Sequence, residues 1–208
     1  MNFKTHSFRH ALVILNENEF VDQLSDVLDV LTNISDEDII QRHEGYSVKG
    51  EEHLPKSLSI AINELIKERF SEKGWTPESG IFQDSEYQGD TWRLDFAKDD
   101  ISIEVAFNHS SVIAWNLIKP VLASELNHVQ KAIQTKVGVI ITATQELKRI
   151  GGFDGAIGTY EKYLDYLPPL QNMLTVPLLI IGLEPPSSFV MKHEEFRKGK
   201  KIGIIQRL

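Results

Sequence analysis

Two short runs of alternating side chains, close together in the sequence, constrain the fold of this chain most strongly. In residues 92–96, and again in residues 101–107, apolar side chains recur at every second position. This period of two predicts two β-strands that each bury one face. The residues between the runs, 97–100, suit a hairpin loop. Because a slip by one residue would turn the apolar side chains toward water, the buried face specifies the register.

The polar face of this hairpin carries two carboxylates. If Phe96 pairs with Ile101, then Asp95 pairs with Ser102, and Glu104 is the diagonal neighbour of Asp95. Diagonal Cβ atoms in such a ladder lie about 7 Å apart, close enough for two carboxylates to share one ion. An oxygen-only site of this kind suits Mg²⁺. Spacing alone favours a simpler interpretation, in which the polar side of the hairpin faces solvent.

Elsewhere the sequence alternates between helical and strand-like patterns. Apolar spacing predicts a helix over 19–34 and another over 57–74, with Ser57 as N-cap and Gly74 at the C′ position. Polar composition predicts loops at 35–55 and 76–90. The remaining expected elements are a helix over 111–134, a strand over 136–142, a helix over 156–167 that stops at Pro168-Pro169, and a strand over 176–183. Two apolar strands around a helix predict a parallel pair within an α/β fold, a mixed central sheet flanked by helices.

Length and charge limit the partners of the chain. Its 208 residues suit a single domain, and they include no cysteine and no apolar run long enough to cross a membrane, which favours a cytoplasmic protein. The net charge of −8 argues against nucleic acid, but the charge is uneven. Residues 187–208 carry six basic and two acidic side chains, so this segment is +4 and the remainder is −12. The segment is either a solvated polar tail or a basic contact surface.

The hairpin and its flanks resemble a known group of enzymes. Residues 94–107 are similar to the active-site hairpin of the BglII/BstYI-type restriction endonucleases, members of the PD-(D/E)xK nuclease superfamily. Upstream, residues 62–75 resemble the helix that precedes that hairpin, and residues 136–141, 158–161 and 177–185 follow in the expected order. The resemblance implies one endonuclease domain over 1–208, with a catalytic core at 57–185 and a basic C-terminal segment at 187–208.

The same resemblance assigns roles to individual residues. It implies that Asp95 is the principal metal ligand, that Glu104 is the second carboxylate, and that the carbonyl of Val105 completes the protein's share of a Mg²⁺ site. It also makes Glu78 a candidate for orienting the attacking water. Further candidates for contacting DNA are Lys98, Asn108, His109, Ser110, Asp154 and Thr159. A turn and helix cap at 108–111, with an exposed imidazole at His109, is an equally good interpretation of part of that set.

One position departs from the pattern. The residue two after Glu104 usually carries Gln, Glu or Lys in this family, and here it is Ala106, which can neither place nor activate water. Either the alanine is a deliberate change, or another group such as Lys98, Glu64 or Glu78 has taken over, or activity has been lost while DNA binding remains.

Three hypotheses about function follow. The first is a homodimeric type II restriction endonuclease that uses Mg²⁺ to hydrolyse double-stranded DNA at a short palindromic site, possible sites being those centred on GATC. The apolar side chains Val112, Trp115, Ile118 and Leu122 are candidates for its dimer interface, or for simple core packing. The second is a catalytically inactive sequence-specific DNA-binding protein on the same fold, and the third is an unrelated α/β domain.

Overall fold

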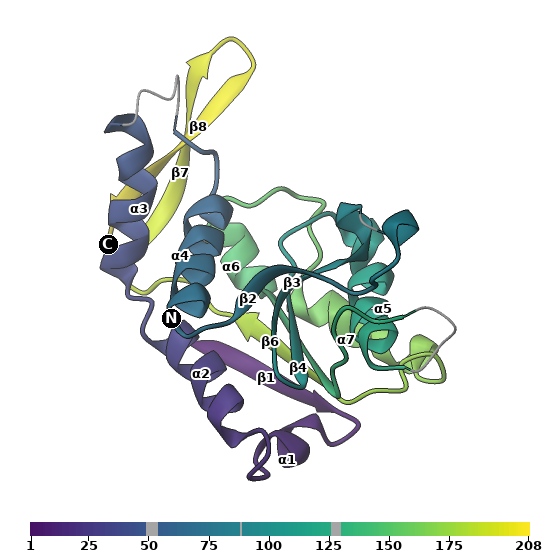
Figure 1. The fold of residues 1–208 in the computed structure, drawn as a ribbon. Coiled ribbons are helices and arrows are strands. Elements are labelled where there is room, and N and C mark those ends of the chain that lie inside the picture. The colour runs from purple at the N-terminus through teal and green to yellow at the C-terminus, as the bar shows by residue number, and fades with distance from the viewer. Residues whose placement is uncertain (49–53, 88, 126–129) are drawn as a thin grey trace.

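A mixed central sheet organises the protein, as Figure 1 shows for the computed structural model, which describes residues 1–48, 54–87, 89–125 and 130–208. Within these residues the sheet has six strands, of which β4, β5 and β6 run parallel and the others antiparallel to their neighbours. In sheet order the strands are β1 (Phe3–Phe8), β6 (Leu178–Leu183), β5 (Val137–Ala143), β4 (Ile101–Val105), β3 (Arg93–Lys98) and β2 (Thr76–Gly80). This confirms the α/β fold class and the parallel pair predicted from the sequence.

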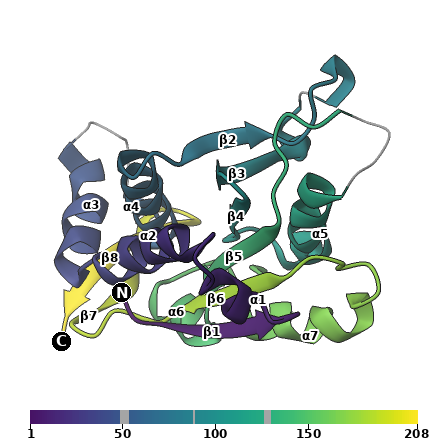
Figure 2. The same cartoon turned by 60° about the horizontal axis from the view of Figure 1, so that its bottom comes forward.

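Helices cover both faces of the sheet, with a separate two-stranded hairpin at one end (Figure 2). The helices are α1 (Ala11–Leu15), α2 (Val21–Thr32), α3 (Asp36–Val48), α4 (Ser59–Glu72), α5 (Ile113–Ser124), α6 (Gln145–Ile150) and α7 (Tyr160–Leu170), and the hairpin strands are β7 (Phe189–Arg197) and β8 (Lys200–Arg207). Across the described residues, none of these helices has the length and apolar character that spanning a membrane requires.

The register of the β3–β4 hairpin differs from the sequence prediction. Phe96 pairs with Ile103 and not with Ile101, because the strands run closer to the turn and leave only Asp99 and Asp100 as the loop. The backbone of Asp99 is left-handed (φ 49°), a conformation that tight hairpin turns need and that aspartate tolerates. The wrong assumption was a four-residue loop. One step further along the observed register, Asp95 lies directly opposite Glu104.

Both faces of this hairpin are buried. Phe96 and Ile103 pack into the larger core cluster, to which α2 and α4 contribute, and Phe70 of α4 contacts the Phe96 ring at 5.0 Å between centroids. On the opposite face α5 packs over β4, with Ala106 in one apolar cluster with Leu117. The solvent-facing interpretation of the polar side is therefore wrong, because a helix covers it.

The segment predicted as a loop at 35–55 contains α3. Ser35 and Asp38 form reciprocal hydrogen bonds, the Ser35 hydroxyl accepting from the Asp38 N–H (3.1 Å) and the Asp38 carboxylate accepting from the Ser35 N–H (2.9 Å). This is the capping-box arrangement with aspartate as the acid. Residues 49–53 of the predicted loop lie outside the described residues.

Other boundaries shift modestly. Helix α4 begins after Leu58 and not after Ser57, whereas Gly74 has the predicted left-handed backbone (φ 78°). Helix α5 ends at Ser124, and the part of the predicted 111–134 helix at 126–129 lies outside the described residues. Helix α7 continues through Pro168 and Pro169 to Leu170. Strands β1 and β2 were not predicted, since neither shows a clear apolar alternation.

The basic C-terminal segment is the β7–β8 hairpin and not a tail. Buried His43 of α3 is hydrogen-bonded to the Gly203 carbonyl (2.9 Å), and His193 is hydrogen-bonded to the carbonyl of Lys56, in the segment that precedes α4 (3.0 Å). Arg207 adds an exposed ion pair with Glu37 (3.0 Å).

Candidate active site

Three carboxylates lie level with one another across neighbouring strands. Pro77 pairs with Phe96 and Ser79 with Leu94, so Glu78 lies across from Asp95, which itself lies opposite Glu104. Glu78 has a left-handed backbone (φ 51°), which interrupts the ladder at this level. The paired residues of the β3–β4 hairpin end at Phe96 and Ile103, so Asp95 and Glu104 are the next residues on the two strands and lie on the same face of the sheet. The register differs from the diagonal arrangement predicted from the sequence.

Glu104 is the most deeply buried of the three, at 2% exposure. One of its oxygens, Oε2, accepts a hydrogen bond from Lys119 Nζ of α5 at 2.8 Å. The other, Oε1, is buried and has no partner among the described residues. Burial raises the pKa of Glu104 to about 8, and the negative charge of Asp95 acts in the same direction, while Lys119 opposes both.

Asp95 is half-buried beside it. Its Oδ2 accepts a hydrogen bond of 2.6 Å from the backbone N–H of Val105. Burial is the largest influence and raises the pKa of Asp95, the hydrogen bond from Val105 and the charge of Lys119 oppose this, and Glu78 raises the pKa further. Two carboxylates in this environment repel one another unless a cation lies between them.

The residues present fit a small divalent cation with oxygen ligands. The unpartnered Oε1 of Glu104 is an acceptor without a donor in a buried position, which is costly unless a cation or water approaches it. No set of three or more His, Asp or Glu residues in the described parts of the chain converges closely enough to hold an ion alone. Mg²⁺ is suited to such a site, because it is commonly held by one or two carboxylates and keeps several waters.

Ala106 and Lys98 do not complete this site. Ala106 is 1% exposed, its methyl group lies on the Glu104 side of β4, and its carbonyl accepts a hydrogen bond from Thr142 (2.9 Å). Lys98 lies on the other face, where its ammonium binds Asp26 Oδ2 at 2.8 Å and the carbonyl of Lys73 at 2.9 Å. The register explains this placement, because Lys98 pairs with Ile101 and alternates with Ala97.

The predicted DNA-contacting residues come from two segments that the fold brings together. Ser110 N–H donates to the Ala156 carbonyl (2.8 Å) and Gly158 N–H to the Asn108 carbonyl (3.0 Å). Asn108 and His109 are exposed, and the His109 ring accepts from the Ser111 N–H (3.1 Å), which is the cap-like geometry of the simpler interpretation. In the second segment, the carboxylate of exposed Asp154 accepts from the Ala156 N–H at 2.8 Å. Thr159 is 1% exposed at the start of α7.

Sequence reasoning missed the polar side chains of α5. Besides Lys119, Asn116 is buried and donates to the hydroxyl of Tyr163 (2.7 Å) and to Asn108 Oδ1 (3.1 Å). Burial raises the pKa of Tyr163, so its hydroxyl stays protonated. The signal was present, since Asn116 and Lys119 are three residues apart and interrupt the apolar stripe of a helix.

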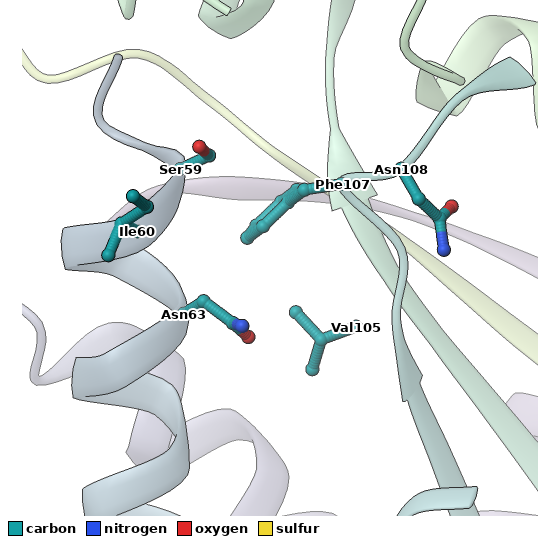
Figure 3. Close-up of a pocket in the computed structure, with 6 residues that line it drawn as sticks. All are labelled: Ser59, Ile60, Asn63, Val105, Phe107 and Asn108. Atoms are coloured by element: carbon teal, nitrogen blue, oxygen red, sulfur yellow. The ribbon is translucent and has the colours of Figure 1, made fainter. Parts of the chain in front are cut away.

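A pocket of about 290 Å³ opens between α4 and the end of β4 (Figure 3). Ser59, Ile60 and Asn63 of α4 line one side, and Val105, Phe107 and Asn108 line the other. Val105 connects this pocket to the carboxylates, because it lines the pocket and its N–H donates to Asp95 Oδ2. Ser59 and Asn63 were not predicted from the sequence, where the candidates on this helix were its apolar stripe and Glu64.

Comparison with known proteins places this arrangement in a family. The family model of the restriction endonucleases BglII and BglIII matches residues 3–183. Among solved structures, restriction endonuclease BglII complexed with a DNA 16-mer aligns with a TM-score of 0.67 and 19% identity over 100% of this chain and 91% of that chain. Free BglII aligns with a TM-score of 0.60 and 17% identity over 100% and 95%. No curated protein sequence matches the chain. The resemblance noted in the sequence is confirmed, and the chain belongs to the BglII/BglIII family of restriction endonucleases, type II site-specific deoxyribonucleases.

Proposed function

We propose that this chain hydrolyses phosphodiesters of double-stranded DNA at a Mg²⁺ site formed by Asp95, Glu104 and the carbonyl of Val105. The observation that carries the proposal is the pair of opposed carboxylates beneath α5, one of which keeps a buried oxygen without a partner among the described residues. Mg²⁺ bound there would supply positive charge that activates water and stabilises the negative charge developing on the phosphate.

The protein's own residues prepare this site. The N–H of Val105 fixes one oxygen of Asp95, and Lys119 fixes one oxygen of Glu104, so that each carboxylate keeps one oxygen for other ligands. Packing of α5 over β4 keeps bulk water from the Glu104 side. Glu78 lies at the same level on β2 and is exposed, paired with Lys67 (3.3 Å), which makes it a candidate for holding a water near Asp95.

A cleavage assay with matched variants tests the proposal. The wild-type chain is expected to cut DNA with Mg²⁺ or Mn²⁺ and not with EDTA, whereas Asp95→Asn and Glu104→Gln lose activity by a factor of about 10² or more. Calorimetric titration with Mg²⁺ should show binding to wild type and weakened binding to both variants. Full activity of either variant, or equal activity in EDTA, would show that the carboxylate pair is not the site.

We also propose that Asn108, His109, Ser110 and Asp154 read or position the DNA. What supports this is their place on two hydrogen-bonded segments, next to the end of the catalytic strand. Asn and Ser side chains can bond base edges in the major groove. Thr159 and Lys98 are weaker candidates, the first because it is buried and the second because its ammonium is bound to Asp26. Single alanine variants, assayed for DNA affinity in Ca²⁺, would separate specific from general contacts.

The proposed substrate is a short palindromic site, with sites centred on GATC the first to test. Sequencing the ends of a completely digested long DNA would identify the site, and ends that share no sequence would contradict a site-specific cut. A homodimer would match the symmetry of such a site. We propose the start of α5 as one part of the interface, because Val112, just before the helix, and Trp115, Ile118 and Leu122 within it are only partly buried. Core packing accounts for part of this set, since Trp115 contacts Trp92 and Ile118 and Leu122 pack against apolar clusters of the chain. Sedimentation analysis should then give a mass of two chains. Cytoplasmic location stays a prediction from composition.

A second function, DNA binding without cleavage, is favoured by one observation, the methyl group of Ala106 at a position beside Glu104. Comparing the wild type with Ala106→Gln separates the two functions. If only the variant cuts, the natural residue limits activity; if neither cuts while both bind, the chain is a binding protein.

A further inference from the structure

The ion pair between Lys119 and Glu104 is unusually well buried for a structural contact. The side chains are 11% and 3% exposed, and Lys119 Nζ lies 2.8 Å from Glu104 Oε2. Transferring both charges into a protein interior costs several kcal/mol per ion, so an apolar pair of similar size often serves stability as well or better. Stability alone therefore does not account for a lysine on the inner face of α5.

The pair also leaves donors and acceptors unused. A lysine ammonium has three N–H donors, and among the described residues only Glu104 accepts from Lys119. Its carboxylate partner likewise keeps Oε1 unpartnered. Lys119 Nζ, with N–H groups that no described residue accepts, thus lies beside Glu104, whose Oε1 has no donor among the described residues. Asp95 is the neighbouring carboxylate on β3.

Other basic groups have partners of their own. Lys98 binds Asp26 on the opposite face of the sheet, Lys67 binds the exposed Glu78 on β2, and Arg42 of α3 binds Glu64 (3.4 Å). Within the part of the chain that the structure describes, Lys119 is the ammonium in contact with Glu104.

We propose that Lys119 is a catalytic residue that supplies, from α5, the donor that Ala106 does not provide on β4. The inference rests on the proposed function. One N–H of the Lys119 ammonium holds Glu104, and another donates to a non-bridging oxygen of the scissile phosphate. The oxygen of water bonds to phosphorus while one P–O ester bond breaks. During this step negative charge grows on the non-bridging oxygen, and the N–H of Lys119 stabilises it there. The proton that water loses and the proton that the leaving oxygen gains are exchanged with solvent.

Moving the lysine between the two positions tests this directly. Lys119→Met removes the positive charge at similar volume. The exchange variant combines Lys119→Ala with Ala106→Lys, which returns an ammonium group from position 106. Its reference is the single variant Lys119→Ala. Lys136→Met is the matched control, because Lys136 is exposed and pairs with Glu19 and Asp100 at the other end of β4. For each variant, single-turnover cleavage of a short duplex containing the mapped site gives the rate, and binding of the same duplex in Ca²⁺ gives the affinity for DNA. Calorimetry measures Mg²⁺ binding, and urea unfolding measures stability.

For Lys119→Met we expect the single-turnover rate to fall by a factor of about 10² to 10³, with Mg²⁺ binding and folding retained. The single-turnover rate of the exchange variant should be at least about tenfold higher than that of Lys119→Ala, because the proposal requires a positive charge at the phosphate and not a particular helix position. Wild-type rates in Lys119→Met, or no recovery in a folded exchange variant, would overturn the inference. If Asp95→Asn is inactive while Lys119→Met is fully active, only the role of Lys119 fails; if Asp95→Asn also cuts at the wild-type rate, the proposed function fails.

Discussion

Replacing Asp95 with asparagine should stabilise the metal-free protein while abolishing its response to Mg²⁺. The amide oxygen can still accept the hydrogen bond from the Val105 N–H, so the change removes mainly one negative charge. Two carboxylates on neighbouring strands repel one another by about 2–4 kcal/mol if their charges lie about 4–8 Å apart at an effective dielectric constant near 20. Lys119 offsets part of this, which leaves an expected gain of roughly 1–3 kcal/mol in the free energy of unfolding.

The pH dependence identifies the origin of that gain. The pKa of Glu104 is raised from 4.5 to about 8, so between these values the folded protein holds a proton that the unfolded chain has released. Stability is therefore lost as the pH rises through this window. At pH 5.5 Glu104 is protonated, so Asp95→Asn removes only the cost of burying the Asp95 charge, and the gain in stability should be smaller. At pH 9 both carboxylates of the wild type are charged, and the advantage of the variant should be fully present.

Urea unfolding followed by tryptophan fluorescence, in EDTA at pH 5.5 and 9, measures this difference. A gain of 2 kcal/mol corresponds to a rise in Tm of about 4–8 °C for a chain of this size. Added Mg²⁺ should stabilise only the wild type, because ligand binding to the folded state alone raises its stability. The control is Asp165→Asn, at an exposed position on α7. An Asp95→Asn variant that is no more stable at pH 9, or equally stabilised at both pH values, would refute the reasoning.

Three further substitutions test the fold. Ser35→Ala should cost about 1 kcal/mol by removing the cap of α3, measured as a lower urea midpoint; no change would deny the capping role. Because burial lowers the pKa of His43, the unfolded chain takes up its proton first, and stability should fall as the pH drops through about 6.5. His43→Gln should remove that part of the dependence, and unfolding curves at pH 5 and 7.5 for both proteins check it. Gly182→Ala would bring a methyl group within 2.5 Å of the Tyr160 ring and should lower the free energy of unfolding by about 1–3 kcal/mol. Calorimetry would show this as a lower Tm, and an unchanged Tm would contradict the prediction.

Regular apolar patterns were the part of the fold that the sequence could predict. The buried strands β5 and β6 and the helix α2 follow from hydrophobic period and were found close to their expected bounds. Helix α3 was missed because its composition is polar, although Ser35 and Asp38 carried a capping signal. Strand β1 was missed because it is an edge strand that gains stability from pairing with β6 and not from its own apolar pattern.

Positions within the site depended on details that the sequence does not determine. A loop of two residues and a loop of four residues both suit the hairpin, and the choice between them decides whether Asp95 lies opposite Glu104 or opposite Ser102. The alternation of polar and apolar side chains is the same in both registers, since they differ by an even number of residues. Turn geometry at Asp99 decided the register, and only the structure shows it.

Lys119 illustrates a different limit. A lysine on the apolar stripe of a helix signals a buried charge, and a buried charge requires a partner. The sequence offers 30 acidic residues as possible partners, and local spacing favours none of them. Packing of α5 on β4 selects Glu104, fifteen positions away. A missing polar group on a catalytic strand is therefore best sought on the buried face of the element that covers that strand, because side chains from both elements reach the same volume. In this protein, that reasoning connects Ala106 to Lys119.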